Sequence, residues 1–167
     1  MIRQAEAKDA QNLIEFLDIV GAESHFLTMD EKGCLMNEAE MSSNLTAIAN
    51  AENNVYFLAF LDGQIAGVFS ISADFHYRIH HIGDIFIAVR TSAQGHGIGS
   101  KLFVKALNWL ENESTIKRLE LTVQKRNTVA QSLYKKFGFE LESIRQKGAR
   151  DENGKLIDVC EMVKFYD

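Results

Sequence analysis

The segment from residue 82 to residue 124 constrains the fold of this chain more than any other. It opens with an apolar run, Ile82–Val89, and closes with an alternating run, Arg118–Gln124. Between them, from about Gly97 to Glu111, apolar residues recur at helical spacing. The segment therefore predicts a strand, an amphipathic helix and a second strand. Such a unit folds as a right-handed crossover between two parallel strands.

The rest of the chain predicts further elements separated by short gaps. Asp9 is a suitable N-cap for a first helix, Gly21 a suitable end for it, and Asp62-Gly63 a hairpin turn. The other expected strands are residues 2–5, 55–61, 64–72, 139–145 and 156–165, and the other expected helices are residues 9–21, a helix from about residue 38, and residues 127–138. This order predicts an α/β fold: a mixed, mostly antiparallel central sheet with one parallel β-α-β crossover and flanking helices.

Length and composition limit the class of protein. The 167 residues suit a single domain spanning residues 1–167. A net charge of −5 is unfavourable for binding the phosphate backbone of a nucleic acid, so we expect no nucleic-acid partner. The chain has no long apolar run and no signal core, which predicts a cytoplasmic protein without a membrane segment. Two cysteines, Cys34 and Cys160, are too few for a disulfide framework or a zinc site built from four cysteines.

The first strand of the crossover leads into its helix through a glycine-rich loop, Gln94-Gly95-His96-Gly97-Ile98-Gly99-Ser100. Backbone N–H groups at the start of a helix point outward and can hold a phosphate, and glycine lets a ligand approach the backbone closely. The spacing fits neither the dinucleotide pattern Gly-x-Gly-x-x-Gly nor the P-loop, which ends in Gly-Lys-Ser/Thr. It fits Gln/Arg-x-x-Gly-x-Gly/Ala. The alternative is a glycine-rich turn that binds nothing.

A second motif follows about thirty residues later: Asn127-x-x-Ala130-x-x-Leu133-Tyr134-x-x-x-Gly138-Phe139. Asn127 and Tyr134 are seven positions apart, so they share a helix face, with the small Ala130 between them. We expect Val129, Leu133 and Phe137 on another face, toward the core. An amide, a methyl group and a phenol on one face suit a polar, elongated ligand.

With these two motifs, the sequence resembles the GNAT superfamily of N-acetyltransferases. The resemblance covers the whole order of elements and is specific at Ile87-Ala88-Val89, at residues 94–99 and at residues 127–139. It implies that acetyl-CoA binds in a V-shaped opening between the two parallel strands. Backbone N–H groups of residues 95–100, next to Gln94, would hold its pyrophosphate. Residues 87–89 would pair with the pantetheine arm like an added strand, and Asn127 would hydrogen-bond the same arm. The implied cofactor-binding residues are Ile87, Ala88, Val89, Gln94, Gly95, His96, Gly97, Ile98, Gly99, Ser100 and Asn127.

Catalysis in this family transfers the acetyl group directly to an amine. The resemblance implies that a backbone N–H near Val89 polarises the thioester carbonyl. Tyr134 is the candidate general acid, because a phenol can protonate the departing thiolate; the alternative is a helix tyrosine that only packs. In some relatives the general base is a glutamate at the position of Thr122, which cannot take a proton. Asp84 is the substitute, directly or through water, and a merely solvated strand charge is its alternative. Glu120 and Glu31 are weaker candidates.

The acceptor is the least constrained part of this interpretation. The resemblance places its pocket at residues 21–37 and 145–158, which carry few motifs. We expect a small-molecule amine such as an amino acid, a polyamine or an aminoglycoside. Three alternatives stay open: a protein N-terminus, a lysine side chain, or a non-catalytic acyl-CoA sensor. A homodimer also stays open. The spacing of His76, His80, His81 and His96 does not suit a metal site, so no metal is expected, although His81 could assist proton removal.

Overall fold

The computed structural model of the chain describes residues 1–27, 33–113 and 115–167. Seven strands form one sheet in the order β1-β2-β3-β4-β5-β7-β6. The strands are β1 Ile2–Gln4, β2 Val55–Leu61, β3 Gln64–Ala73, β4 Ile82–Val89, β5 Arg118–Gln124, β6 Glu140–Arg150 and β7 Leu156–Phe165. The helices are α1 Ala10–Glu23, α2 Glu38–Asn50, α3 Ile98–Glu113 and α4 Thr128–Lys136, with two short 3₁₀ helices, η1 Ala7–Asp9 and η2 Thr91–Ala93. Strands β4 and β5 are parallel, and the other described neighbours are antiparallel, which confirms the mixed α/β fold predicted from the sequence.

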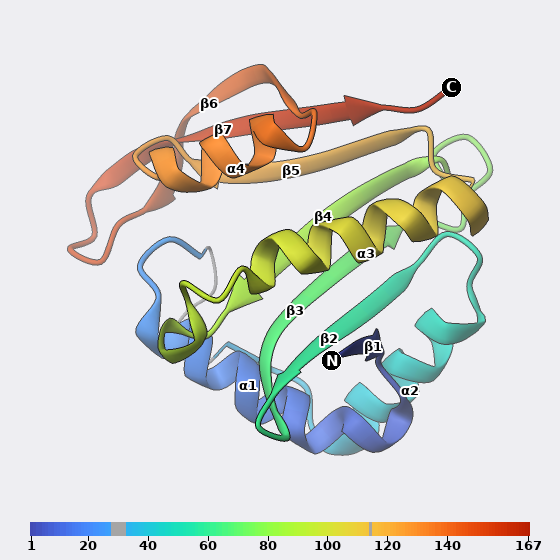
Figure 1. The fold of residues 1–167 in the computed structure, drawn as a ribbon. Helices are drawn as coiled ribbons and strands as arrows, with labels where there is room; N and C mark the ends of the chain where they lie inside the picture. Colours follow the sequence, from blue (N-terminus) through green and yellow to red (C-terminus); the bar gives the residue numbers. More distant parts are fainter. Residues whose placement is uncertain (28–32, 114) are drawn as a thin grey trace.

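The helices cover both faces of the sheet (Figure 1). Helices α3 and α4 pack on one face, over a core that includes Phe69 and Phe103, whereas α1 and α2 pack on the other face, over Leu58 and Val68. Strand β2 shows why this works: its apolar run is continuous, so Phe57 enters the first core while Leu58 enters the second.

The sheet opens between its two parallel strands. Strands β4 and β5 pair at three positions, ending at Asp84 opposite Glu120. Beyond that level β4 follows β3 to Val89, while β5 follows β7 to Gln124. At the closed end, a Cβ on Gly83 would lie 2.7 Å from Ile71 Cγ2 and 3.2 Å from Leu119 Cδ2, so only glycine fits the tight packing there. The strands are therefore close at one end and separated at the other.

Asp9 and Gly21, predicted as the N-cap and the end of the first helix, do not have these roles in the structure. Asp9 precedes α1 but makes no side-chain cap, because its carboxylate accepts hydrogen bonds from the Arg3 guanidinium at 2.8 Å and from the Glu6 N–H at 2.7 Å. Gly21 does not end the helix. Its φ is not positive, it is buried, and α1 continues to Glu23 before Ser24 takes an extended conformation.

Two further differences concern the C-terminal part of the chain. Strand β6 extends to Arg150, five residues beyond the predicted end, because an irregularity between Arg145 and Ala149 lets pairing with β7 resume. Lys147 has φ 54° in this irregularity. Val129 is 81% exposed and does not share the core-facing side of Leu133 and Phe137, so that prediction is wrong: in the first turn of α4 it is Ala130 that packs against the core. Across the described ranges, each helix is too short or too polar to cross a membrane.

Candidate active site

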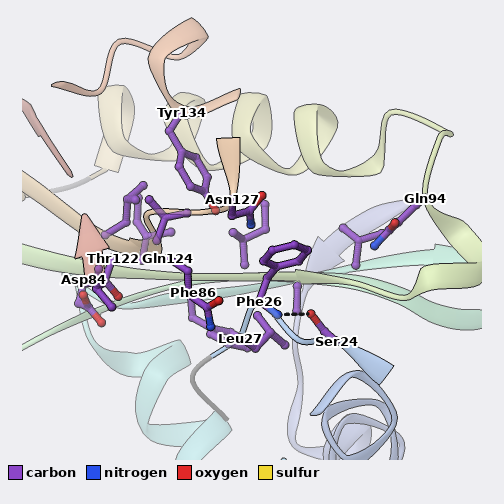
Figure 2. Close-up of a pocket in the computed structure, with 17 residues that line it drawn as sticks. Ser24, Phe26, Leu27, Asp84, Phe86, Gln94, Thr122, Gln124, Asn127 and Tyr134 are labelled. Carbon is purple, nitrogen blue, oxygen red and sulfur yellow. Dashed lines mark hydrogen bonds between the residues drawn. The ribbon is translucent and has the colours of Figure 1, made fainter. Parts of the chain in front are cut away.

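A cavity of about 280 Å³ occupies the opening between β4 and β5 (Figure 2). One wall is the β4 segment from Asp84 to Val89, and the opposite wall is the end of β5 from Leu121 to Gln124. The segment after α1, with Ser24, Phe26 and Leu27, closes a third side. The cavity is therefore a cleft that runs through the sheet, with side chains from both faces.

The cleft brings together about half of the residues predicted for the site. The predicted residues that line it are Asp84, Ile87, Ala88, Val89, Gln94, Asn127 and Tyr134. The predicted residues that do not line it are Gly95, His96, Gly97, Ile98, Gly99 and Ser100. These six form the turn into α3 and its first residues, immediately after Gln94. The two sets are continuous in the chain, so the glycine loop lies at one end of the cleft.

The glycine loop exposes its backbone to open space. Gly95 and Gly97 have φ values of 85° and 71°, and a Cβ at either position would meet no atom within 4 Å. Open space therefore lies directly over the backbone. Helix α3 starts with the hydrogen bond from the Lys101 N–H to the Gly97 carbonyl. The N–H groups before Lys101 have no acceptor within the helix and can bind an anion.

The β4 wall offers a free backbone edge. Strand β4 pairs with β3 along its length from Gly83 to Val89, but its pairing with β5 ends at Asp84. Among the described strands, none pairs with the other edge of Ile85–Val89. The unpaired N–H and C=O groups at a strand edge can bind an extended ligand, which then lies beside the strand as a further strand.

Asn127 joins the two motifs of the sequence. Its Oδ1 accepts a hydrogen bond of 3.2 Å from the Ala130 N–H, which caps α4. The capping bond uses the oxygen of the side chain only, and the residue also lines the cleft. The Nδ2 group is a donor that the cap does not use.

Tyr134 belongs both to the core and to the cleft. Its ring is 8% exposed and lies 5.7 Å from the ring of Phe103 and 6.4 Å from that of Phe139, centroid to centroid. The side chain points from α4 toward the cleft, as Figure 2 shows. Burial raises the pKa of the phenol to about 12, so it stays protonated at neutral pH. Within the described chain, the hydroxyl has no protein hydrogen-bond partner, so it is available to a ligand.

Asp84 lies at the closed end of the cleft, opposite Glu120 in the register of the two strands. Partial loss of hydration, together with the negative charge of Glu120, raises the pKa of the Asp84 carboxyl. Glu120 itself is ion-paired with Arg118 at 2.9 Å. Thr122 lines the cleft beside Asp84, whereas Glu31 lies outside the described residues. Of Asp84 and Glu120, the two described carboxylates considered from the sequence, Asp84 lines the cleft.

The histidines considered from the sequence lie away from the cleft lining. His76 contacts Asp74 at 2.5 Å in the β3–β4 loop, and the backbone carbonyl of His81 accepts hydrogen bonds from Lys117 and Arg118. Among the described residues, no group of three or more His, Cys, Asp or Glu side chains has a geometry that could hold a metal ion.

Several residues of the cleft were not predicted from the sequence. Phe26 and Leu27 come from a segment without a motif, and Phe86 and Gln124 lie on the strands themselves. The strand alternation contained the signal for the last two, since Phe86 lies two positions from Asp84 on the same face, and Gln124 lies two positions from Thr122.

This fold and this cleft are those of the acetyltransferase class that the sequence resemblance indicates. The chain belongs to the Acetyltransferase (GNAT) family, whose model matches residues 23–139. That range includes the glycine loop, α4 and both strands that border the cleft.

Individual relatives agree with this assignment. A GNAT-family acetyltransferase from Streptococcus pneumoniae has a crystal structure that matches 99% of this chain and 99% of its own, with 42% identity and a TM-score of 0.96. The L-amino acid N-acetyltransferase AaaT of Escherichia coli (strain K12) is 32% identical over 107 residues, which are 64% of this chain and 65% of the relative. The chain thus matches just under two thirds of that enzyme's length.

A more distant structure shares the fold. A phosphinothricin acetyltransferase from Sinorhizobium meliloti, solved in complex with acetyl-CoA, has 21% identity and a TM-score of 0.79, covering 99% of this chain and 87% of its own.

Proposed function

We propose that the protein transfers an acetyl group from acetyl-CoA to the primary amine of a small molecule, and that the acceptor is an amino acid. The observation that carries this proposal is the cleft between β4 and β5. It leads from the glycine loop along a free strand edge to a protonated phenol and a carboxylate. Family membership supports the acetyl transfer. The L-amino acid N-acetyltransferase of Escherichia coli supports the amino acid.

Binding of acetyl-CoA would use backbone groups more than side chains. The N–H groups of Gly95–Ser100 would hold the pyrophosphate at the start of α3. The free edge of Ile87–Val89 would pair with the amide groups of the pantetheine arm. The unused Nδ2 donor of Asn127 would bind the same arm from the opposite wall. Acetyl-CoA supplies the acetyl group already activated as a thioester.

The transfer step needs one proton acceptor and one proton donor. An amine with an ordinary pKa of about 10 is mostly protonated at neutral pH and must lose a proton before it attacks. Asp84 would receive that proton, directly or through water. The amine nitrogen then bonds to the acetyl carbon, the carbon–sulfur bond breaks, and the nitrogen, now part of an amide, gives up its second proton to water. Tyr134 would give its proton to the thiolate that leaves, while a backbone N–H near Val89 would stabilise charge on the carbonyl oxygen.

One observation favours a second function. In some relatives the residue at the position of Thr122 is a glutamate that acts as the general base. A threonine hydroxyl cannot act as a general base at neutral pH. A protein without an effective base would bind acetyl-CoA but not turn it over, as a sensor does.

The two functions differ in thiol release. Purified protein is incubated with acetyl-CoA and a panel of amino acids, polyamines, aminoglycosides and short peptides, and free CoA thiol is measured. We expect saturable release with amino acids above the rate without acceptor. Tight binding of acetyl-CoA by calorimetry without release for any amine would support the sensor. Release with peptides alone would replace the small-molecule acceptor by a protein.

A further inference from the structure

Gln124 is a polar side chain with an unusual position. It is 2% exposed and lines the cleft near the end of β5. Its Oε1 accepts a hydrogen bond of 2.8 Å from Arg126 Nε. Because an arginine can only donate, this bond fixes which end of the amide is the oxygen. The amide nitrogen has no protein partner among the described residues, so its N–H groups are available to a molecule in the cleft.

The strand register places Gln124 opposite the predicted thioester site. Asp84 lies opposite Glu120, and side chains four positions further along each strand lie on the same face at equivalent levels. Gln124 therefore lies across the opening from Ala88, the middle of the segment expected to hold the pantetheine arm. On its other side Gln124 pairs with Val159 of β7, which also lines the cleft.

Arg126 holds Gln124 and connects the end of β5 with the segment after α1 and with the turn between β6 and β7. Its guanidinium donates to the Glu152 carboxylate at 2.8 Å, in the turn between β6 and β7, and to the His25 carbonyl at 2.9 Å, after α1. It also lies over the ring of Phe26, 5.3 Å from the centroid. The bond from Arg126 lowers the pKa of the Glu152 carboxyl to about 2, so this link persists at neutral pH.

The surroundings of Gln124 indicate which chemical group it binds. A free N–H donor attracts an oxygen atom and cannot bind an ammonium group. The carboxyl of Asp84 lies on the same face toward the closed end of the cleft, and the side chains of Phe26, Leu27 and Phe86 provide an apolar lining. A molecule that fits has an oxygen group and an apolar side chain, and the proposed reaction requires a primary amine as well. An apolar α-amino acid has all three on one carbon atom.

We propose that the Gln124 amide binds the α-carboxylate of an apolar amino-acid acceptor, and that Arg126 is a positioning residue that orients this amide. The assignment rests on the proposed acetyltransferase function and adds how the acceptor is recognised. With its carboxylate on Gln124, the amino acid presents its amine toward Ala88, and its proton would reach Asp84, about 13 Å further along the strand, through water. Its side chain lies against Phe26 and Leu27.

The test compares L-leucine with isoamylamine, which has the same side chain and amine but no carboxylate. Gln124→Leu should raise KM for leucine by about 10-fold to 100-fold, as expected for loss of a hydrogen bond to a charged group. KM for isoamylamine and for acetyl-CoA should change less than about twofold. Gln124→Glu keeps the shape and the bond to Arg126 but turns a negative oxygen toward the cleft. It should reverse the preference toward isoamylamine.

Variants of Arg126 separate positioning from folding. Arg126→Met should raise KM for leucine with little effect on isoamylamine, and Arg126→Lys should restore only part of the loss, because one ammonium cannot reach all the partners of a guanidinium. Gln11→Leu, on the exposed side of α1, is the matched control and should behave like the original protein.

Each outcome bears on the proposal. An equal rise in KM for leucine and isoamylamine in both Gln124 variants would overturn the carboxylate assignment. Absence of transfer to any amine would refute the proposed function, but calorimetry of leucine binding in the presence of CoA would still test Gln124. Leucine that binds the original protein and Gln124→Leu equally well would then refute its role.

Discussion

The Tyr134→Phe variant tests the chemical role of a residue that is also part of the core. The substitution retains the ring against Phe103 and Phe139 and removes a hydroxyl that has no protein partner in the described chain. The free energy of unfolding at neutral pH should therefore change by less than about 1 kcal/mol. Loss of the proton donor should lower kcat about 100-fold, which corresponds to about 2.7 kcal/mol in the activation barrier.

The raised pKa of Tyr134 adds a second readout at alkaline pH. The phenol titrates at about 12 in the folded protein, against 10.0 for an ordinary tyrosine. The unfolded chain therefore releases its proton first. The stability linked to this group is fully present below pH 10 and is lost as pH rises from 10 to 12. Two pKa units correspond to about 2.7 kcal/mol. Stability should therefore decline less steeply above pH 10 in Tyr134→Phe than in the original protein.

Three measurements check this reasoning together. Single-turnover thiol release gives the rate of the chemical step, calorimetry gives the Kd for acetyl-CoA, and denaturant unfolding between pH 8 and pH 11 gives the stability difference. The Kd should not change, because backbone groups form most of the predicted binding site. A chemical step at the original rate in Tyr134→Phe would show that water protonates the thiolate and that Tyr134 only packs. A parallel stability profile would show that the phenol is not shielded from water as described.

Three further substitutions address the loop, the base and the packing behind the loop. Gly97→Val should weaken acetyl-CoA binding at least 10-fold by calorimetry, because the side chain would occupy the open space over a backbone with φ 71°. Asp84→Asn should lower kcat/KM for the amine by about 100-fold at neutral pH and remove the acidic limb of its pH profile, which the raised pKa of Asp84 places above that of an ordinary aspartate. Gly67→Ala should cost about 1–3 kcal/mol in unfolding free energy, since its Cβ would lie 2.9 Å from Ile98 Cγ2.

Matched variants make these predictions specific. Gly63→Val introduces the same kind of strain, at φ 78° with no atom within 4 Å, in the β2–β3 hairpin. It should lower stability without changing acetyl-CoA affinity, and equal weakening in Gly63→Val and Gly97→Val would remove the case for the phosphate loop. An unchanged pH profile in Asp84→Asn would assign the base elsewhere. A Gly67→Ala variant as stable as the original protein would show that α3 can move away from β3 at no cost.

The strands were predictable from the sequence because their signals are local. The run from Val55 to Leu61 is apolar at every position, as a strand buried on both faces must be. The signals at Asp9 and Gly21 were misleading because tertiary contacts decide them. Arg3 binds the Asp9 carboxylate, and the burial of Gly21 in α1 leaves no left-handed turn there. The extension of β6 depends on Lys147 at positive φ, which no residue preference predicts.

The glycine loop of the candidate site could be predicted from the sequence, and the contacts around Gln124 could not, for a physical reason. A phosphate loop needs glycines at set spacing, so it leaves a motif in the sequence. Acceptor recognition at Gln124 depends on Arg126, which brings together residues from three distant parts of the chain, including His25 and Glu152. Contacts of this kind leave no spacing pattern that a single sequence can reveal.

Because of the opening between β4 and β5, the stability of the folded protein should depend on the concentration of acyl-CoA. Only three residue pairs of the backbone ladder join β4 to β5. Backbone pairing therefore contributes little to holding β5 against β4, and the shared core beneath α3 contributes more. A ligand bonded to the free edge of β4 and to the Asn127 side chain would link the two sides of this seam. At a free concentration one hundred times its Kd, it would stabilise the closed form by about 2.7 kcal/mol. Slow amide hydrogen exchange along β5 would then report the acyl-CoA level around the protein.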